Sequence, residues 1–347
     1  MVHIGIDLHK RESQICWLDE ATGEMRQQRI LTRRDRFQAV LGGQAPAEVL
    51  IEASTESEWV ARCLEALGHR VHVVDPNYAP MYPRPRRCRH KNDQRDAAAL
   101  AEASVKGTYR TVHRVGEPRR RVRQLLTLRE ALVRTRTRQI SLVRAWVRGD
   151  GLRVRSGAAE SFVARVRELD LADDLRALVS PALQLLELVE TQLQVVDTQV
   201  AECVAADPAM TRLLTVPRIG PVTSAAFVAA VDVPERFVRA SQVGSYLGLV
   251  PKDDSTGDRR RVGHITKAGP GRVRYLLVQA GWGILRGPET PGLPLRRWAE
   301  GVARRRGERV AVVALARRLA RLLWAMWRDG TVFDGARGAE PRGRRAA

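Results

Sequence analysis

The sequence has few cysteines and no long hydrophobic run. Its four cysteines, Cys16, Cys63, Cys88 and Cys203, are widely scattered and form no C-x-x-C pair. This argues against a zinc site or a disulfide framework and fits a reducing cytosol. No segment approaches the roughly 18 consecutive apolar residues of a membrane-spanning helix. We therefore expect a protein without a membrane partner.

The N-terminus also lacks the apolar stretch of a secretory signal peptide. Asp7, His9 and Lys10 interrupt the apolar run with which the chain begins. One of these residues is unusual for another reason. Asp7 lies inside the pattern of a β-strand, where a side chain is expected to be buried.

Acidic residues are scarce relative to basic ones. Asp and Glu total 39 against 59 Lys and Arg, which gives a formal net charge of +20 and a pI near 11.1. Such an excess indicates a polyanionic partner, most simply nucleic acid. Arginine outnumbers lysine, which suits bidentate contacts with phosphates and bases. A GC-rich genome would also explain the choice of arginine, but it would not explain the net charge.

The first hundred residues do contain a clear alternation of strand and helix patterns. Apolar or alternating runs predict strands at residues 2–7, 13–20, 24–31, 48–54 and 69–76. Helical spacing predicts helices at residues 35–43, 56–68 and 92–105. The order of three strands, helix, strand, helix, strand, helix predicts an α/β layer with a mixed sheet.

From about residue 118 the strand signals thin out and long helical patterns replace them. Residues 119–149 form an amphipathic pattern with arginine on the polar face, and residues 181–207 carry Leu and Val at near-heptad spacing. These patterns predict a helical hairpin or coiled-coil arm, and a plain helical bundle is the alternative. The Arg face of the first helix is a candidate surface for duplex RNA.

The C-terminal part is mostly helical. Residues 213–231 resemble a helix-hairpin-helix, whose Gly-containing turn presents backbone N–H groups to a phosphate, although Arg218 stands where the commoner turn has Gly. The chain of 347 residues is long enough for three domains. We expect an α/β domain, a long-helix arm, a mostly helical C-terminal domain and a basic, disordered tail, at residues 1–110, 111–207, 208–332 and 333–347.

Four carboxylates stand where acidic residues are unexpected. Asp7 and Glu52 lie inside apolar strands, and Asp93 and Asp96 share one face of the helix that follows a basic loop. The first and fourth strands of such a sheet are commonly adjacent, so the four can converge. Each alone reads as a cap, turn or surface charge. Together they predict a Mg²⁺ site with one or two ions, because burying them without a cation would be very costly.

An ordered set of motifs resembles one known family. The segments are "IGIDLHK", "IEAS", "KNDQRDAAALA", "VPRIG" and "YLGLVPKDDSTGDRRRVGHITKAGPGRVRYLLVQAGW". In this order, around a long helical middle, they resemble the DEDD transposases of the IS110 (IS-one-ten) family of insertion sequences. The resemblance covers nearly the whole chain.

The resemblance implies a fold, a metal and partners. It implies a RuvC-like, RNase H-fold N-terminal domain whose acidic tetrad falls on Asp7, Glu52, Asp93 and Asp96, with Mg²⁺, or alternatively Mn²⁺, as the cofactor. It also implies a recombinase that joins donor and target DNA with a structured guide (bridge) RNA. The protein would be a homo-oligomer, a dimer or tetramer, in which subunits complete each other's sites. Its expected location is the prokaryotic cytoplasm, in association with the nucleoid.

The resemblance further implies a nucleophilic serine in the loop after "GLVP". Ser255 in "KDDSTG" is the candidate, and Thr256 is the alternative because some relatives place the serine directly before the glycine. Several basic residues are candidates for binding nucleic acid. They are Arg84, Arg86, Arg87, Arg89, Lys91, Arg119, Arg120, Arg121, Arg259, Arg260, Arg261, Lys267, Arg272 and Arg274.

Two other functions compete with the recombinase. A metal-dependent, structure-specific nuclease of the Holliday-junction-resolvase type would use the carboxylates and water without a covalent intermediate. A non-enzymatic scaffold would use only the arm and the basic surface. Trapping of a covalent protein–DNA adduct separates the recombinase from both.

Overall fold

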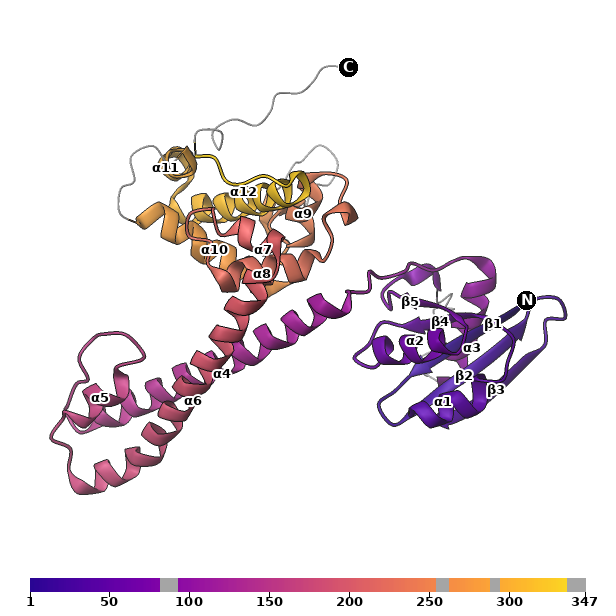
Figure 1. Ribbon diagram of the computed structural model, residues 1–347, viewed down its shortest axis with the longest axis horizontal. Coiled ribbons are helices and arrows are strands. Elements are labelled where there is room, and N and C mark those ends of the chain that lie inside the picture. Colours follow the sequence, from indigo (N-terminus) through magenta and orange to yellow (C-terminus); the bar gives the residue numbers. More distant parts are fainter. Residues whose placement is uncertain (82–92, 254–261, 288–293, 336–347) are drawn as a thin grey trace, which may run out of the picture. The chain divides into compact units, whose positions relative to one another are not determined.

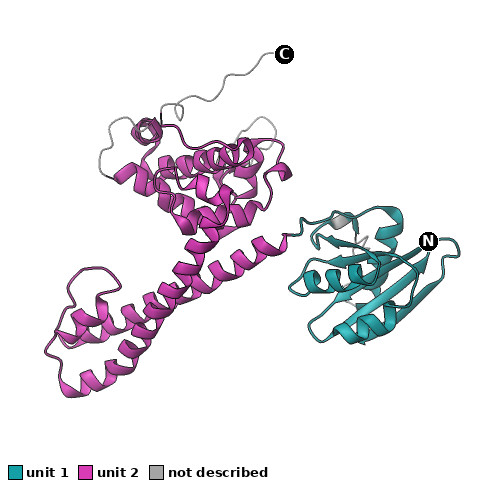
Figure 2. Ribbon diagram, viewed as in Figure 1, with its two compact units in different colours: residues 1–114 teal, residues 115–347 magenta. Residues whose placement is uncertain are grey.

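The computed structural model describes residues 1–81, 93–253, 262–287 and 294–335 (Figure 1). Packing divides the chain into two compact units, residues 1–114 and residues 115–347 (Figure 2). The long helices and the C-terminal helices fall in one unit because they share a hydrophobic core. The finer domain boundaries expected from the sequence stay predictions.

The first unit is built on a five-stranded sheet in the order β3-β2-β1-β4-β5. The strands are β1 (Val2–Leu8), β2 (Glu12–Asp19), β3 (Met25–Leu31), β4 (Glu48–Glu52) and β5 (Arg70–Val74). β1, β2 and β3 form an antiparallel meander, whereas β1, β4 and β5 run parallel. The predicted mixed sheet and the predicted pairing of the first and fourth strands are confirmed.

Helices cover both faces of this sheet (Figure 1). α1 (Arg34–Leu41) and α2 (Ser57–Ala66) bury their apolar sides against one face, where Ile4, Ile6 and Ile51 point. α3 (Asp93–Lys106) lies on the other face and follows the short 3-10 turn η1 (Ala79–Met81) in the described chain. Successive side chains of a strand point to opposite faces of the sheet. Every second residue of a strand therefore contacts α1 and α2, and the residues between them contact α3.

Gly5 allows α3 to lie unusually close to the central strand. A Cβ atom at this position would overlap the carbonyl oxygen of Ala97 and the amide nitrogen of Ala101, both in the backbone of α3. Next to the contact, α3 presents the small side chains of Ala97 and Ala101, which are fully buried. Small residues on both elements therefore set the spacing of helix and sheet.

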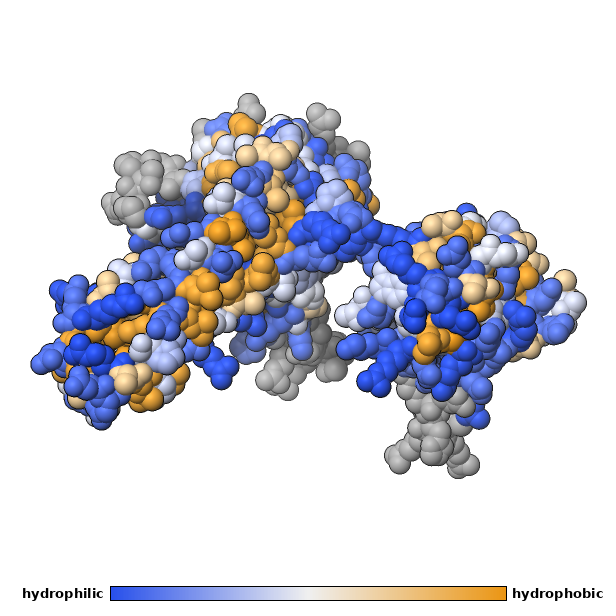
Figure 3. Space-filling model, turned by 60° about the horizontal axis from the view of Figure 1, so that its bottom comes forward, coloured by the Kyte–Doolittle hydropathy of each residue, from blue (hydrophilic) through white to orange (hydrophobic). Residues whose placement is uncertain are grey.

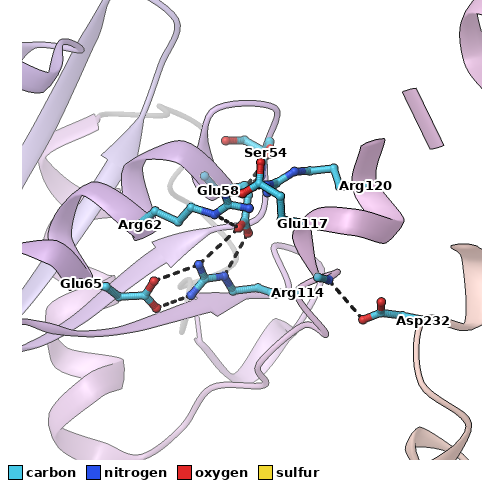
Figure 4. A network of polar contacts seen from close by, with 10 residues as sticks. Ser54, Glu58, Arg62, Glu65, Arg114, Glu117, Arg120 and Asp232 are labelled. Atoms are coloured by element: carbon cyan, nitrogen blue, oxygen red, sulfur yellow. Dashed lines mark hydrogen bonds and ion pairs between the residues drawn. The ribbon is translucent and has the colours of Figure 1, made fainter. Parts of the chain in front are cut away.

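The C-terminal end of the first unit is tied to α2 by a charged network (Figure 4). The guanidinium of Arg114 donates to Glu58 at 3.0 Å and to Glu65, and Arg62 donates to Glu58 from one turn further along α2. Hydrogen bonds to Glu65, followed by those to Glu58, raise the pKa of Arg114 despite its partial burial. The network fixes the segment that leads out of this unit.

The second unit begins with two long antiparallel helices, α4 (Glu117–Gly149) and α6 (Asp173–Ala205), joined through the short α5 (Phe162–Arg167) (Figure 1). The helical hairpin expected from the sequence is confirmed. α6 starts eight residues before the predicted start at Pro181. Leu175 and Val179 are buried in the core at this end of the hairpin. Their packing offsets the hydrogen bond that Pro181 cannot donate inside a helix.

The other end of the hairpin is embedded in the C-terminal helices. These helices are α7 (Pro208–Leu213), α8 (Pro221–Val231), α9 (Ala240–Tyr246), α10 (Gly271–Arg286), α11 (Pro294–Arg306) and α12 (Glu308–Asp329), with the 3-10 turn η2 (Pro234–Arg236) between α8 and α9. α8 is the central helix, since every residue from Thr223 to Val231 is buried. Among the described residues, no helix has both the length and the hydropathy needed to span a bilayer.

Arg123 connects the hairpin to this core. From α4 it donates to the carbonyl oxygens of Ala229 and Ala230 at 2.7 and 3.1 Å, near the end of α8. A cation is favourable there, because the last carbonyls of a helix have no partner within the helix. This arginine therefore has a structural contact within the fold.

The turn before α8 contains a residue in the left-handed conformation that glycine normally adopts. Arg218 has φ of 64°, in the left-handed region, at the position where the sequence departs from the commoner helix-hairpin-helix turn. Its side chain lies against Gly283 and Gly287 of α10 and its C-terminal cap. The arginine stem packs over Gly283 and its guanidinium over Gly287, which explains how a non-glycine residue is held in this conformation.

Candidate metal centre

Side chains alternate along β1, so His3, Gly5 and Asp7 lie on the face of the sheet that α3 covers. His3 Nδ1 lies 2.7 Å from Ser104 Oγ, near the C-terminal end of α3, and Gly5 lies against the middle of that helix. α3 therefore runs opposite to β1, so its first residue, Asp93, lies at the end of the strand that carries Asp7. Strand parity and helix direction together place these two carboxylates near each other.

Asp7, His9 and Asp93 form a compact cluster. His9 Nε2 lies 3.3 Å from Asp7 Oδ2 and 3.3 Å from Asp93 Oδ1. One potential ligand atom from each of the three residues lies within 4.8 Å of the others. Asp7 is only 4% exposed, whereas the other two side chains are accessible to solvent. The cluster thus has a buried base and an open outer side.

A small cavity lies beside this cluster. Its volume is about 140 Å³, and its lining includes His9, Asp93, Glu12 and Arg29. Arg29 on β3 reaches across it, with Nη2 3.6 Å from Asp93 Oδ2 and Nη1 3.4 Å from Glu12 Oε2. Arg11 also lines the cavity, so two exposed arginines add positive charge beside the acidic residues.

Two members of the expected tetrad lie outside the cluster. Glu52 ends β4, one position after Ile51, which pairs with Ile6 of β1. By this parallel register Glu52 lies beside Asp7, on the face that α3 covers. Asp96 is one turn beyond Asp93 on α3. Among the described residues, the group whose atoms lie close enough to hold a metal consists of Asp7, His9 and Asp93 and contains neither of them.

The donor set of the cluster suits a divalent cation. Two carboxylates and an imidazole are ligands that such ions accept, and a cation would offset the charge of the buried Asp7. An imidazole ligand favours Mn²⁺ over Mg²⁺, which prefers oxygen ligands. The residues present therefore fit a metal, with Asp7, His9 and Asp93 nearest to each other.

His9 was missed by the sequence reasoning, although the signal was present. It lies two residues after Asp7, and side chains two apart in an extended segment point to the same side. The motif "IDLHK" thus carries both an oxygen and a nitrogen donor. Only the four carboxylates were predicted as ligands.

Several of the expected nucleic-acid-binding arginines make contacts within the chain. Arg272 pairs with Glu130 of α4, and Arg274 donates to the carbonyl oxygens of Leu247 and Ala268 at 2.9 and 3.0 Å. Burial works against ionisation of Glu130, but Arg272 and then Arg134 lower its pKa. These contacts give Arg272 and Arg274 structural roles in addition to any contact with nucleic acid.

The three arginines at the start of α4 differ from one another. Arg119 pairs with Asp207 and lies over the ring of Trp327. Arg120 lies 3.3 Å from Glu117 and is mostly buried, whereas Arg121 extends into solvent. Arg121 is the one best placed for a phosphate, and the exposed Lys267 is similarly accessible.

The candidate serine lies outside the described residues. Ser255, Thr256, Arg259, Arg260 and Arg261 fall between β6 (Pro251–Asp253) and β7 (Val262–Ile265), which pair antiparallel. The loop candidates Arg84, Arg86, Arg87, Arg89 and Lys91 also lie outside the described residues.

The base of the β6–β7 hairpin is tightly held. Gly248 and Gly269 both have positive φ, and a Cβ at either would overlap the backbone of the facing segment. Thr266 donates its N–H to the carbonyl of Val250 at 2.9 Å, and Arg274 bonds both segments. The described segments before β6 and after β7 are therefore held against each other.

A mixed sheet with a buried aspartate at the end of its first strand, and a second acidic residue on the helix across from it, is compatible with the RNase H-like domain of DEDD transposases. Residues 4–149 match a family model of this type, a transposase with the DEDD domain of IS110. Residues 210–290 match a second model, described as the transposase IS116/IS110/IS902 family. The chain belongs to this family of insertion-sequence transposases, which are DNA-processing enzymes.

Curated relatives align over almost the whole chain. A protein named probable family 20 transposase from Pseudomonas aeruginosa is 31% identical over 340 residues, which cover 95% of this chain and 98% of the relative. The transposase for insertion sequence element IS1328 of Yersinia enterocolitica is 28% identical over 333 residues, with the same coverage. The transposase for IS1111A of Coxiella burnetii is 26% identical over 330 residues, covering 93% and 88%. The resemblance inferred from the motifs is confirmed.

Proposed function

We propose that this transposase is an RNA-guided DNA recombinase that cuts and rejoins donor and target DNA with a serine nucleophile. The observation that carries the proposal is the convergence of Asp7, His9 and Asp93 at the end of β1, in a chain that also has the "STG" loop. The family membership supports the transposase class, and the net charge of +20 supports binding to DNA and to a structured RNA.

The acidic site would position and polarise a DNA phosphate. Asp7 and Asp93 would hold a divalent cation, with His9 beside them and Glu52 and Asp96 joining when DNA is bound. Such a cation, Mg²⁺ or Mn²⁺, acts as a Lewis acid on phosphoryl oxygens. Arg29 would hold the phosphate backbone at the mouth of the site, where its guanidinium is exposed.

The serine would carry the strand through the exchange. Ser255 Oγ would attack the scissile phosphorus and displace one DNA oxygen, which leaves as a hydroxyl after taking up the serine proton through solvent or a nearby base. A hydroxyl of the partner strand would then displace Ser255 from the phosphorus, which restores the serine and forms the new phosphodiester. Each step replaces one phosphorus–oxygen bond by another, so no external energy source is required.

The alternative is a structure-specific nuclease that uses the same acidic site and water. Geometry at the acidic site does not distinguish the two, because both need a divalent cation beside the phosphate. The sequence "KDDSTG" after "GLVP" favours the serine mechanism, because the resemblance to the family implies a nucleophilic serine in this loop.

A trapping experiment tests the proposal. Purified protein, with Mg²⁺ and the guide RNA transcribed from its own element, is incubated with donor DNA that carries a nick next to the exchange site. We expect a covalent protein–DNA adduct that survives denaturation, with the modified peptide mapped to Ser255. Asp7→Asn should abolish the adduct without loss of DNA binding.

The serine variants provide the discriminating comparison. Ser255→Ala should abolish the adduct and Thr256→Ala should retain it, and the reverse result would assign the nucleophile to Thr256. Efficient cleavage with no adduct in the wild type, and unchanged cleavage in the Ser255→Ala, Thr256→Ala double variant, would establish the nuclease instead.

A further inference from the structure

Polar side chains dominate the surface of the first unit. In Figure 3 residues 1–114 present a mostly hydrophilic face, whereas apolar surface runs along the long helices of the second unit. Near the metal centre the polar character continues inward, where Gln14 of β2 is only 3% exposed. Buried amides normally use all their polar atoms, so an atom that the fold leaves over is a candidate for binding a ligand.

Gln14 lies in a row of polar residues that crosses the sheet. In the antiparallel register Asp7 of β1 pairs with Gln14, and Gln14 pairs with Arg29 of β3. Paired residues of adjacent strands point to the same face of a sheet, so all three lie on the face that α3 covers. Gln14 lines the small cavity together with His9 and Asp93. A volume of about 140 Å³ has room for only a few water molecules at about 30 Å³ each, so these side chains lie near one another.

Two amides connect Gln14 to the first turn of α3. Gln14 Nε2 donates a hydrogen bond to Oε1 of Gln27 on β3 at 3.3 Å, and Gln27 Nε2 donates to the backbone carbonyl of Gln94 at 3.2 Å. Gln94 directly follows Asp93 in α3. This chain of hydrogen bonds therefore runs from a residue that pairs with Asp7 to a residue next to Asp93.

The backbone carbonyl of Gln94 determines which way both side-chain amides point. A carbonyl oxygen can only accept, so Gln27 turns its Nε2 toward Gln94 and its Oε1 toward Gln14. Gln14 must then donate its Nε2 to Gln27, which leaves its Oε1 for the cavity. No described residue donates a hydrogen bond to this oxygen. The amide of Gln14 thus has a fixed orientation and one atom that the fold does not use.

An amide oxygen at this place suits a cation and not an anion. A phosphate oxygen needs a hydrogen-bond donor, whereas the Nε2 of Gln14 is directed to Gln27. Carbonyl oxygens are ligands of Mg²⁺ and Mn²⁺, and a water held by such an ion can donate to the same oxygen. The orientation that the hydrogen bonds enforce is therefore the one that a divalent cation requires.

We propose that Gln14 is a further oxygen ligand of the metal centre, through Oε1 directly or through one bound water, and that Gln27 is the positioning residue that holds this oxygen in place. The proposal rests on the divalent cation of the proposed function, but not on the serine or the guide RNA. A neutral ligand stabilises the ion without adding to the negative charge of two carboxylates, so the ion still attracts a phosphate.

Binding of Mn²⁺ to the full chain without nucleic acid tests the role of Gln14, with free Mn²⁺ measured by electron paramagnetic resonance. Gln14→Met keeps the length of the side chain and removes the amide, and we expect it to raise the dissociation constant about tenfold. Asp7→Asn provides the reference for loss of the site. Weaker binding by Asp7→Asn with unchanged binding by Gln14→Met would overturn the role of Gln14 and leave the metal centre standing. A wild type that binds no Mn²⁺ would overturn both.

Two variants separate the positioning role of Gln27 from a merely structural one. Gln27→Met removes both hydrogen bonds and should weaken Mn²⁺ binding severalfold. Gln27→Glu loses the bond to Gln94 but still accepts from Gln14, so the amide of Gln14 keeps its orientation. Gln28→Glu, the next exposed position of β3 and on the opposite face, measures the effect of the added charge. After correction for this effect, Gln27→Glu should bind like the wild type. Equal weakening by both variants of Gln27 would overturn the positioning role, because only the bond to α3 would then matter.

The exposed position of Gln27 protects the test against misfolding. Thermal unfolding verifies that each variant is folded. If the buried change Gln14→Met prevents folding, Gln27→Met provides the same test from the surface of the sheet. A folded Gln27→Met protein that binds Mn²⁺ as tightly as the wild type would overturn the proposal.

Discussion

At the scale of single residues, the candidate metal centre combines the imidazole of His9 with two carboxylates. Asp7 is nearly fully buried, whereas Asp93 beside it remains accessible to solvent. His9 lies 3.3 Å from both. A divalent cation bound there would gain a nitrogen ligand that a purely carboxylate site lacks.

His9→Ala should therefore weaken metal binding. We expect the apparent affinity for Mn²⁺ to fall about tenfold, the lower end of the effect of losing a group that holds a metal site together. Isothermal titration of DNA-free protein measures this directly. His264→Ala, at an exposed histidine of β7, is the matched control and should bind like the wild type. Equal affinities of His9→Ala and wild type would exclude His9 as a ligand.

Glu48 makes the stability of the sheet sensitive to acid. It accepts hydrogen bonds from Arg70 at 2.8 Å and pairs with His72 at 2.7 Å across β4 and β5. Burial works the other way, but these partners lower the pKa of Glu48 below its ordinary value of 4.5. A carboxylate with a lowered pKa stabilises the fold above its unfolded pKa and loses this contribution as the pH falls through the folded pKa.

The contribution of Glu48 to the free energy of unfolding should therefore decrease below about pH 4.5. We expect wild type to exceed Glu48→Gln by about 1 kcal/mol at pH 7, where the carboxylate is ionised in both states. The difference should shrink as the pH falls below 4.5. Urea unfolding of both proteins across this range measures it, and a difference that stays constant with pH would contradict the assignment.

At the scale of elements, the approach of α3 to β1 positions Asp93 relative to Asp7. Gly5 makes this approach possible, because any side chain at residue 5 would collide with the backbone of α3. The collision involves main-chain atoms, which cannot move aside as the end of a flexible side chain can. The helix itself would have to shift.

Gly5→Ala should consequently disturb the metal site without touching a ligand. We expect a loss of about 1–3 kcal/mol of stability from overpacking, together with weaker Mn²⁺ binding, because α3 carries Asp93. Thermal unfolding and metal titration of the variant test both effects. Gly43→Ala, in open space after α1, is the control and should change neither. Lowered stability with unchanged metal affinity would show that the position of α3 does not determine metal binding.

The sequence predicted elements better than it predicted contacts between side chains. Alternation of apolar residues located the strands, and the predicted strand order correctly placed the strand of Asp7 next to the strand of Glu52. The close approach at Gly5 and the ligand position of His9 depend on tertiary packing, which periodicity does not encode. On α6, both the buried Leu and Val residues and the exposed ones (Leu178, Leu185, Leu188 and Val195) recur at heptad spacing, so only the fold decides which are covered.

At the scale of the whole molecule, the two units have separate hydrophobic cores. Ile4, Ile6 and Phe37 belong to the core of the first, whereas Leu277 and Trp324 belong to the core of the second. Much of the positive charge is engaged inside the second unit, as in the pairs of Arg129 with Asp197 and of Arg272 with Glu130. Part of the arginine content therefore serves folding, through ion pairs within this unit.

Separate cores predict that the units unfold separately. In calorimetry of the full chain we expect at least two transitions, since each core forms its own cooperative network. Gly5→Ala should lower only the transition of residues 1–114. Leu277→Ala, which opens a cavity at a fully buried position, should cost about 2–5 kcal/mol and lower only a transition of residues 115–347. A single transition that both variants shift equally would show instead that the two cores are energetically coupled. Loss of packing in the core of one unit would then also lower the stability of the other unit.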